Sequence, residues 1–273
     1  MKTNPASMAQ AIETPVAVAV KDVKHVYGGV VHALGPINLE LHQGEFFTTI
    51  GPSGCGKTTL MDIVAGLTVP TDGEVTFEGN PVRGAVPEGV GIVFQDDASF
   101  PWLTVWDNIA FGLRRQGVDA AEIKRRVDYA IDFMGLKGFG NARPSQLSGG
   151  MRQRVCIART FVMEPRLILL DEPFGALDQQ TRFLMGDELL RLWRETGATV
   201  LLITHSLDEA ALLSDRIGIM SARPGNFIDI VETNWPSDRD SRLASGEAFG
   251  KVTSRLWDSL RGESMKAMGE SGK

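Results

Sequence analysis

The residues best suited to chemistry form a glycine-rich run at positions 51–58, which fits the pattern Gly-x-x-x-x-Gly-Lys-Ser/Thr. Glycines allow the backbone to wrap so that several N–H groups point at one anion. The lysine can reach the β- and γ-phosphates of a nucleotide, and the threonine hydroxyl can ligate Mg²⁺. The predicted nucleotide ligands are Gly51, Pro52, Ser53, Gly54, Cys55, Gly56, Lys57, Thr58 and the next residue, Thr59.

The sequence on either side of this phosphate loop has the strand–loop–helix pattern that such a loop requires. Residues 46–50 are apolar enough to form a buried strand, and residues 59–65 are typical of a helix. A helix that begins near Lys57 would direct its positive N-terminal end at the phosphates. The context therefore favours a functional phosphate site over an accidental glycine-rich turn.

Three further apolar runs of the chain each end in polar residues. These are Gln95, the adjacent pair Asp171 and Glu172, and His205. In a parallel α/β sheet, ligands bind outside the carboxyl ends of the strands. If these strands are parallel, the three motifs and the phosphate loop share one edge of the sheet and form one site.

The chemistry of each side chain predicts its role at such a site. Asp171 could hold Mg²⁺, and Glu172 could orient or deprotonate the attacking water. Gln95 could position that water or contact the metal, and His205 could donate a hydrogen bond to the γ-phosphate. Each also has a plainer interpretation as a strand exit or a surface residue, so the prediction depends on the set of motifs and not on any one of them.

Composition limits the class of protein. The chain has 273 residues, is 43% hydrophobic and carries a formal net charge of -6, which favours a globular protein without a nucleic-acid partner. No apolar run reaches the length of a membrane span, and the polar start of the chain lacks a signal-peptide core. Cys55 and Cys156 are the only cysteines, which suits a reducing compartment. A soluble cytosolic protein is expected.

The rest of the chain reads as an α/β domain with additions. Residues 16–20, 30–34 and 37–41 are predicted to be short antiparallel strands, and residues 217–220 the last core strand. Tyr27 lies among the first strands, either as an edge aromatic or as a face on which adenine stacks. A helical pattern runs from Thr104 to Met134, and a second helix is predicted over 151–161. An amphipathic C-terminal helix is predicted from Phe249, Val252, Leu256 and Leu260.

The run Leu147-Ser148-Gly149-Gly150-Met151-Arg152-Gln153 completes a set of motifs with the phosphate loop, Gln95, residues 167–173, residues 176–178 and His205. With these residues the chain resembles the ATP-binding subunit of ABC transporters over residues 16–222. The resemblance implies a phosphate-loop NTPase (RecA-like) parallel sheet core with an N-terminal antiparallel β subdomain and a helical insert at about 97–152. Residues 1–15 would then be a flexible tail and residues 223–273 a C-terminal extension.

The resemblance also implies how the site is completed. Two copies of the chain would dimerise head to tail, with ATP held between the phosphate loop of one copy and Ser148, Gly149 and Gly150 of the other. Residues 176–178, which end in Asp178, would cross the seam of the dimer. Tyr27 stands where the family stacks adenine, so the resemblance favours its functional interpretation. The family often has Gln at the position of Met151. The phosphate contacts that the resemblance implies come from Ser148 and the backbone, so this difference should not abolish function.

A finer resemblance, carried by residues 93–95, residues 100–108 and Met151, is to importers of the nitrate/sulfonate/taurine type. It implies a peripheral ATPase at the cytoplasmic face of the membrane, acting with two membrane-spanning permease subunits and, indirectly, a solute-binding protein. The alternative is a soluble ABC ATPase of DNA repair or translation, against which the short helical insert and negative charge argue. A nucleotide-binding regulator without turnover is disfavoured because Glu172 and His205 are both present.

Overall fold

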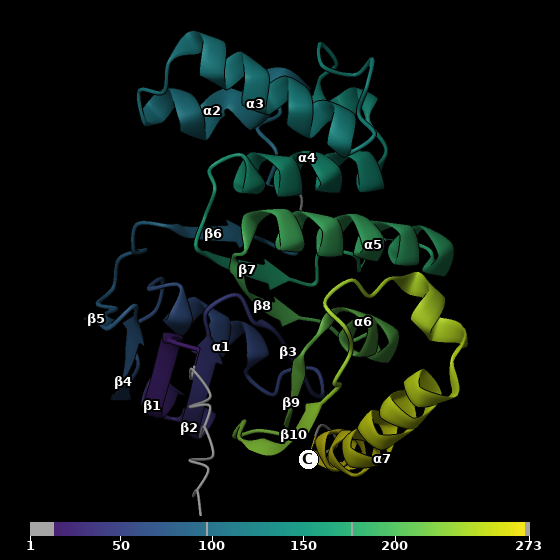
Figure 1. Cartoon of the computed structure of the whole chain (residues 1–273). Coiled ribbons are helices and arrows are strands. Elements are labelled where there is room, and N and C mark those ends of the chain that lie inside the picture. The colour runs from purple at the N-terminus through teal and green to yellow at the C-terminus, as the bar shows by residue number, and fades with distance from the viewer. Residues whose placement is uncertain (1–13, 97, 176, 271–273) are drawn as a thin grey trace, which may run out of the picture.

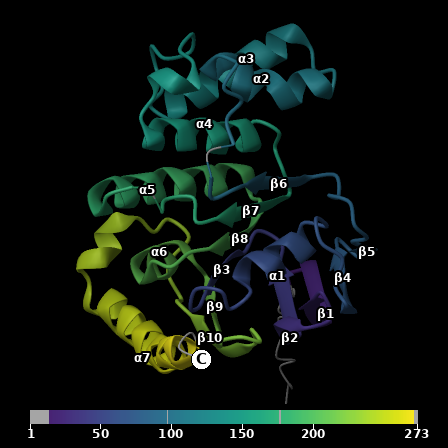
Figure 2. The ribbon, with the colours of Figure 1, turned by 180° about the vertical axis from the view of Figure 1, so that it is seen from behind.

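The computed structural model describes residues 14–96, 98–175 and 177–270. The predicted tail at 1–15 therefore lies outside the described residues except for its last two positions, and so does Ala176. Figure 1 shows two sheets in the lower part of the molecule and a group of helices above them. Figure 2 shows the same arrangement from behind.

The larger sheet has six strands in the order β10-β9-β3-β8-β7-β6, and all neighbours except β10 and β9 are parallel. Every residue of β3, β7 and β8 is buried, as expected for parallel strands covered on both faces. Its strands are β3 (Phe46–Ile50), β6 (Val90–Val93), β7 (Leu167–Asp171), β8 (Thr199–Ile203), β9 (Arg216–Met220) and β10 (Phe227–Glu232).

The predicted strand over residues 217–220 is present as β9, but it is not the last strand of the larger sheet. β10 follows β9 and pairs with it antiparallel, with Val231 opposite Ile217. β10 is an edge strand with one fully buried residue, so its sequence lacks the continuous apolar run of a central strand. The proposed division of the chain at residue 222 remains a prediction, and β10 favours placing that boundary after Glu232.

The smaller sheet is antiparallel, in the order β2-β1-β4-β5. Its strands are β1 (Val16–Tyr27), β2 (Val31–His42), β4 (Asp72–Phe77) and β5 (Asn80–Pro81). The antiparallel pairing was predicted, but the three short strands are in fact one long hairpin whose turn contains Gly28 and Gly29 at positive φ. Pro36 does not break β2 because β2 lies at the sheet edge, where a missing N–H is tolerated.

Seven α-helices occur in the described part of the chain. They are α1 (Lys57–Val64), α2 (Val105–Arg115), α3 (Ala120–Phe133), α4 (Gly149–Phe161), α5 (Gln179–Thr196), α6 (Leu207–Leu213) and α7 (Glu247–Glu270), with 3₁₀ turns η1 (Pro144–Gln146) and η2 (Ser241–Ser245). Side chains of Thr104, Asp119, Ser148, Asp178 and Ser206 cap helix N-termini. No helix among the described residues is long and apolar enough to cross a membrane.

Two helices were not predicted, and one begins earlier than predicted. α5 and α6 connect the strands of the larger sheet, and α5 has polar residues along most of its length. α4 begins at Gly149, two residues before the predicted start, because the Ser148 side chain accepts a hydrogen bond from the Met151 N–H. The predicted C-terminal helix is present as α7, whose Phe249 and Leu256 are buried in the core.

The core has two parts, one on each face of the larger sheet. Alternate residues of β7 divide between them: Ile168 and Leu170 belong to the part beneath the helices, and Leu167 and Leu169 to the part shared with α1 and the smaller sheet. In both views α1 lies between the two sheets, and α2, α3 and α4 group at one end of the molecule. This is the predicted fold class, with the helical insert projecting from the parallel core.

Candidate nucleotide-binding site

The carboxyl ends of β3, β6, β7 and β8 meet at one edge of the larger sheet, as predicted. The parallel registers pair Thr49 with Ile203, Asp171 with Ile203, and Val93 with Leu170. The segments after these strands are therefore neighbours, although they are separated by tens of residues in the chain. The phosphate loop, Gln95, the Asp171–Glu172 pair and His205 all begin from this edge.

The phosphate loop has the backbone that its glycines predict. Gly54 and Gly56 adopt positive φ angles of 73° and 109°. A Cβ on Gly56 would approach the Ala33 carbonyl oxygen to 2.8 Å, so only glycine fits there. α1 begins at Lys57, and the buried Lys57 ammonium donates to the carbonyl oxygens of Gly51 at 2.9 Å and Pro52 at 3.0 Å. A cation is thus held inside the curve of the loop at a helix N-terminus, which suits a phosphate group.

Thr58 and Asp171 lie close enough together to share one ligand. The Thr58 hydroxyl donates to Asp171 Oδ2 at 3.3 Å, and the other oxygen, Oδ1, is buried without a hydrogen-bond partner. Burial raises the pKa of the Asp171 carboxyl, the nearby negative charge of Glu172 adds to this, and the Thr58 hydrogen bond opposes it. A buried carboxylate with an unsatisfied oxygen beside a hydroxyl is a suitable pair of ligands for a hard cation.

Glu172 is the centre of a second cluster. His205 Nε2 lies 2.6 Å from Glu172 Oε1, and Gln95 Nε2 donates to Glu172 Oε2 at 3.1 Å. Burial lowers the pKa of His205, as does the charge of Lys57, while Glu172 acts in the opposite direction. The imidazole is therefore mainly neutral at pH 7 and donates its Nε2–H to the carboxylate.

The backbone of Glu172 is also unusual. Its φ angle is 45°, in the left-handed region that non-glycine residues rarely adopt. Hydrogen bonds fix this conformation, from the Glu172 N–H to the Ile203 carbonyl at 2.9 Å and from the Gly175 N–H to the Glu172 carbonyl at 3.1 Å. Strain of this kind concentrates at functional sites, where the surrounding structure holds it in place.

Tyr27 lies beside the phosphate loop and not at a distant sheet edge. Its hydroxyl is 3.2 Å from the Thr59 hydroxyl, and its ring meets His25 edge-on with centroids 4.4 Å apart. The side chain is exposed, so part of the ring is open to a ligand. This position is compatible with the predicted adenine contact, which remains a prediction.

Ser148, Gly149 and Asp178 lie at exposed helix starts, outside the clusters around Lys57 and Glu172. Ser148 caps α4, and Asp178 caps α5 by accepting hydrogen bonds from the Thr181 N–H at 3.0 Å and hydroxyl at 2.6 Å. These Thr181 hydrogen bonds lower the pKa of Asp178. Gly150 faces the loop before α5, where an added Cβ would meet Leu177 Cδ2 at 2.8 Å. No contact in the described part of the chain joins Ser148 to the phosphate loop.

Sequence reasoning missed two groups that support the site. Arg182 on α5 donates to the Leu177 carbonyl at 3.0 Å and pairs with the buried Glu209 at 3.1 Å, and Glu209 accepts from Thr204 at 2.5 Å. This chain of contacts connects the loop before α5 to the segment that carries His205. The second group is Arg223, which donates to the Gly54 carbonyl. Arg223 follows the predicted strand at 217–220 by three residues, and this position at a strand end was the one sequence feature that could have indicated it.

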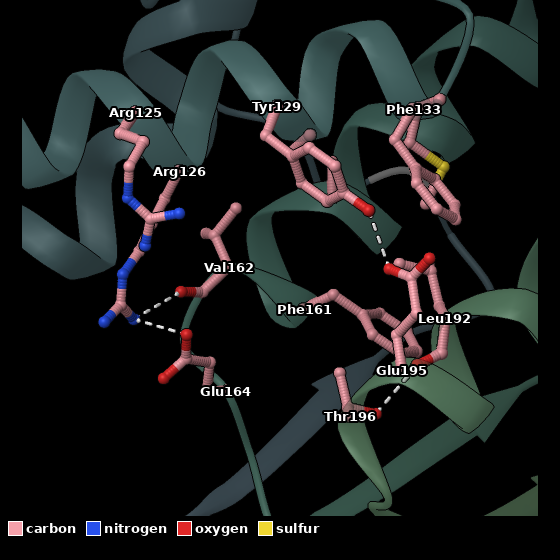
Figure 3. Close-up of a pocket in the computed structure, with 13 residues that line it drawn as sticks. Arg125, Arg126, Tyr129, Phe133, Phe161, Val162, Glu164, Leu192, Glu195 and Thr196 are labelled. Carbon is pink, nitrogen blue, oxygen red and sulfur yellow. Dashed lines mark hydrogen bonds and ion pairs between the residues drawn. The ribbon is translucent and has the colours of Figure 1, made fainter.

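A separate cavity of about 220 Å³ lies between α3, α4 and α5 (Figure 3). The Tyr129 hydroxyl donates to Glu195 at 2.7 Å across it, and the Arg126 guanidinium bonds the Val162 carbonyl and Glu164 (Figure 3). The first contact connects α3 to α5, and the other two connect α3 to the end of α4. None of the residues that line this cavity belongs to the motifs at the strand ends, so it is not the nucleotide site.

Comparison with known proteins agrees with this geometry. The family model described as ABC transporter matches residues 34–175. The taurine import ATP-binding protein of Ruegeria pomeroyi is 48% identical over 239 residues, covering 85% of this chain and 89% of the relative. That of Pelagibacter ubique is 50% identical over 200 residues, covering 73% and 75%.

A solved structure, the dimeric post-hydrolysis state of the ATP-binding cassette MJ0796 bound to ADP and Pi, has a TM-score of 0.70 to this fold at 31% identity. The match covers 79% of this chain and 98% of that one. The family match and the two relatives each cover half of this chain or more, and the relatives align over most of their own length. The chain therefore belongs to the ABC transporter family, as an ATP-hydrolysing, ATP-binding member of it.

Proposed function

We propose that this chain powers an importer for a small solute of the nitrate/sulfonate/taurine type. It would act as a head-to-tail dimer bound peripherally at the cytoplasmic face of the membrane, with two permease subunits and, indirectly, a solute-binding protein. The observation that carries the proposal is the convergence of the phosphate loop, Gln95, Asp171, Glu172 and His205 at one sheet edge. An ATP-binding subunit of this kind does not contact the solute. The proposed solute class is therefore supported only by the sequence similarity to the taurine import ATP-binding proteins.

Glu172 is proposed as the general base. Its carboxylate is oriented on both oxygens, by Gln95 on one and His205 on the other, and such fixed orientation is what a base needs to act on a single water. Lys57 would donate to the γ-phosphate oxygens as negative charge develops on them. A neutral imidazole has a single N–H, so His205 would donate to the γ-phosphate only by turning that N–H away from Glu172. Gln95 would hold the attacking water or contact the metal.

Thr58 and Asp171 would hold Mg²⁺, with Gln95 as a further candidate. The unpartnered Asp171 Oδ1 and the adjacent Thr58 hydroxyl fit this ion, which prefers oxygen ligands and keeps several waters. When bound, the ion would neutralise charge on the β- and γ-phosphates. Asp171 must be ionised to ligate it, and because burial raises the pKa of Asp171, Mg²⁺ binding would weaken on acidification sooner than at an exposed aspartate.

The second half of the site is proposed to come from a partner copy. Ser148, Gly149 and Gly150 begin α4 at an exposed N-terminus, which is a surface suited to phosphate oxygens. Asp178 stands at another exposed helix start, next to Leu177, which contacts Gly150. Because these groups are not joined to their own phosphate loop, a nucleotide bound between two copies would use both halves.

Mixing two inactive variants tests this arrangement. Lys57→Ala damages the phosphate loop, and Ser148→Arg blocks the opposite half. In a mixed dimer one site carries both lesions and the other carries neither, so random mixing leaves roughly a quarter of all sites intact. ATP-dependent capture of one tagged variant by the other should exceed the self-association of either one. ATPase activity should be measured alongside capture, although it returns only if a single intact site can turn over.

A site formed by one chain gives the contrary result, because mixing would then offer no advantage over either variant alone. The matched control is a mixture of Lys57→Ala with Ser145→Arg, which places the same bulky cation on an exposed serine of η1. That mixture should capture no better than Lys57→Ala does with unmodified chain. Capture between Lys57→Ala and Ser148→Arg that is no greater than the self-association of either variant would contradict the head-to-tail arrangement.

The surface proposed to receive a permease subunit lies between the larger sheet and α2. Asn108 is fully buried and binds the loop before α2 through the carbonyls of Phe100, Leu103 and Thr104 and the N–H of Phe100. The loop is thereby held rigid and presents Trp102, which is 68% exposed and stacks on Phe100. Phe100 and Phe111 also line an adjoining cavity of about 260 Å³. A preformed apolar surface of this kind favours a helix or loop of a partner protein.

Trp102→Ala should weaken assembly with the permease subunits and leave ATP binding unchanged, because it removes exposed apolar area remote from the phosphate loop. Co-purification with the membrane subunits, at equal expression, measures the effect. Met265→Ala is the matched control, since Met265 is 66% exposed but lies on α7. Equal recovery of the complex with both variants would contradict this docking surface.

The alternative of a soluble ATPase in DNA repair or translation has no support from the relatives compared above, which are named for import. The formal net charge of -6 also gives no general attraction to nucleic acid. A transport role accounts for both the motifs and the exposed aromatic loop.

A further inference from the structure

The segment between β9 and β10 lies directly against the phosphate loop. Arg223 donates two hydrogen bonds to the Gly54 carbonyl oxygen, from Nε at 3.2 Å and from Nη2 at 3.0 Å. Two residues later, a Cβ on Gly225 would stand 2.1 Å from the Cys55 carbonyl oxygen, so the two backbones touch. Gly225 also exchanges backbone hydrogen bonds of 3.0 Å with Ala33 and Gly35. The segment is therefore hydrogen-bonded to β2 and packs against the phosphate loop.

The same segment is tied to the C-terminal helix. Glu263 of α7 accepts a hydrogen bond from the Ala222 N–H at 2.8 Å, and both residues are buried. Glu263 is held in turn by Lys266 at 2.5 Å. A continuous set of contacts thus runs from α7 through Glu263 and Ala222 to Arg223 and Gly54.

We propose that Arg223 is a positioning residue for the phosphate loop and that Glu263 couples the loop to α7 through it. The peptide between Gly54 and Cys55 is planar, so fixing the Gly54 carbonyl outward fixes the Cys55 N–H inward. The Cys55 N–H does point into the loop, toward the Pro52 carbonyl at 3.3 Å, to which Lys57 also donates. Arg223 therefore preorganises an inward N–H before phosphate arrives, which lowers the cost of ordering the loop on binding.

This inference rests on nucleotide binding by the loop, and the first measurement is ATP affinity. Arg223→Ala should raise the KM and the Kd for ATP about tenfold, as expected for losing hydrogen bonds from an ionised donor. Its kcat should change by no more than about twofold, because loop geometry serves the bound substrate and the transition state alike. Arg223→Lys keeps a cationic donor and should recover part of the affinity.

Arg255→Ala is the matched control. Arg255 lies on α7 and pairs with Asp229 of β10, so its removal also takes an arginine from the C-terminal region without touching the loop. It should leave KM unchanged. An unaltered KM in Arg223→Ala, or an equal rise in Arg255→Ala, would overturn the positioning role. If the unmodified chain bound no ATP, the proposed function itself would fail instead.

The coupling to α7 has its own test. Glu263→Ala should raise the KM for ATP, as Arg223→Ala does. The KM of the double variant should not exceed the higher KM of the two single variants, because both residues act through one set of contacts. Glu263→Gln keeps a carbonyl that can accept from Ala222 and should stay close to the unmodified protein. Independent, multiplying effects would overturn the coupling. If Glu263→Ala fails to fold, Glu263→Asp replaces it, because the shorter side chain withdraws the carboxylate from the Ala222 N–H, and an unchanged KM in that variant would overturn the coupling.

Discussion

Glu172→Gln should reduce ATP hydrolysis by about 10²–10⁴-fold, the usual contribution of a general base, while ATP still binds. The amide has the shape of the carboxylate but cannot take up a proton from water. It also has one acceptor oxygen, whereas Gln95 and His205 both donate to Glu172, so one of the two contacts is lost. The orientation of the group changes together with its charge.

Because hydrolysis then stalls after binding, the ATP-bound dimer should accumulate. Gel filtration with Mg²⁺ and ATP measures this, with ADP as the comparison, and single-turnover hydrolysis measures the rate. Glu195→Gln is the matched control, since it alters the hydrogen bond with Tyr129 at the α3–α5 cavity and should leave hydrolysis unchanged. A Glu172→Gln protein that stays monomeric and hydrolyses normally would remove Glu172 from the mechanism.

Lys57→Ala should lower kcat by about 10²–10³-fold, the range measured for losing one group that stabilises charge in a transition state. The Lys57 ammonium is buried within the loop, where the low local dielectric strengthens its interaction with phosphate. ATP affinity should also fall, because the same cation meets the bound nucleotide. This distinguishes Lys57→Ala from Arg223→Ala, in which kcat is retained.

Steady-state ATPase assays and ATP binding measure the effect, with thermal melting to confirm that the variant is folded. Lys251→Ala is the matched control, because Lys251 is an exposed lysine of α7 whose partner is Glu247 of the same helix. It should retain full activity. Turnover near that of the unmodified protein in Lys57→Ala would contradict the assignment of the loop as the catalytic phosphate site.

The sequence alone determined the elements that follow from local chemistry. Glycines at 54 and 56 mark positive φ angles, and the apolar run at 167–170 marks a strand buried on both faces. From such signals the phosphate loop, the parallel core and the convergence of four motifs could be predicted, because parallel strands always bring their carboxyl ends to one edge. The edge strand β10 and the polar helix α5 gave weaker signals and were missed.

The tertiary structure alone decided which polar groups meet. Spacing in the chain could not show that Glu172 takes a strained φ angle, or that its two oxygens meet Gln95 and His205, which are 77 and 33 residues away in the chain. Spacing in the chain also could not show that Arg223 donates to the Gly54 carbonyl. The segment after β9 lies beside the phosphate loop only because β9 and β3 are neighbours in the folded sheet. Hydrogen bonds between distant residues depend on strand order and register, and these are fixed by the packing of the whole core and not by any local run of sequence.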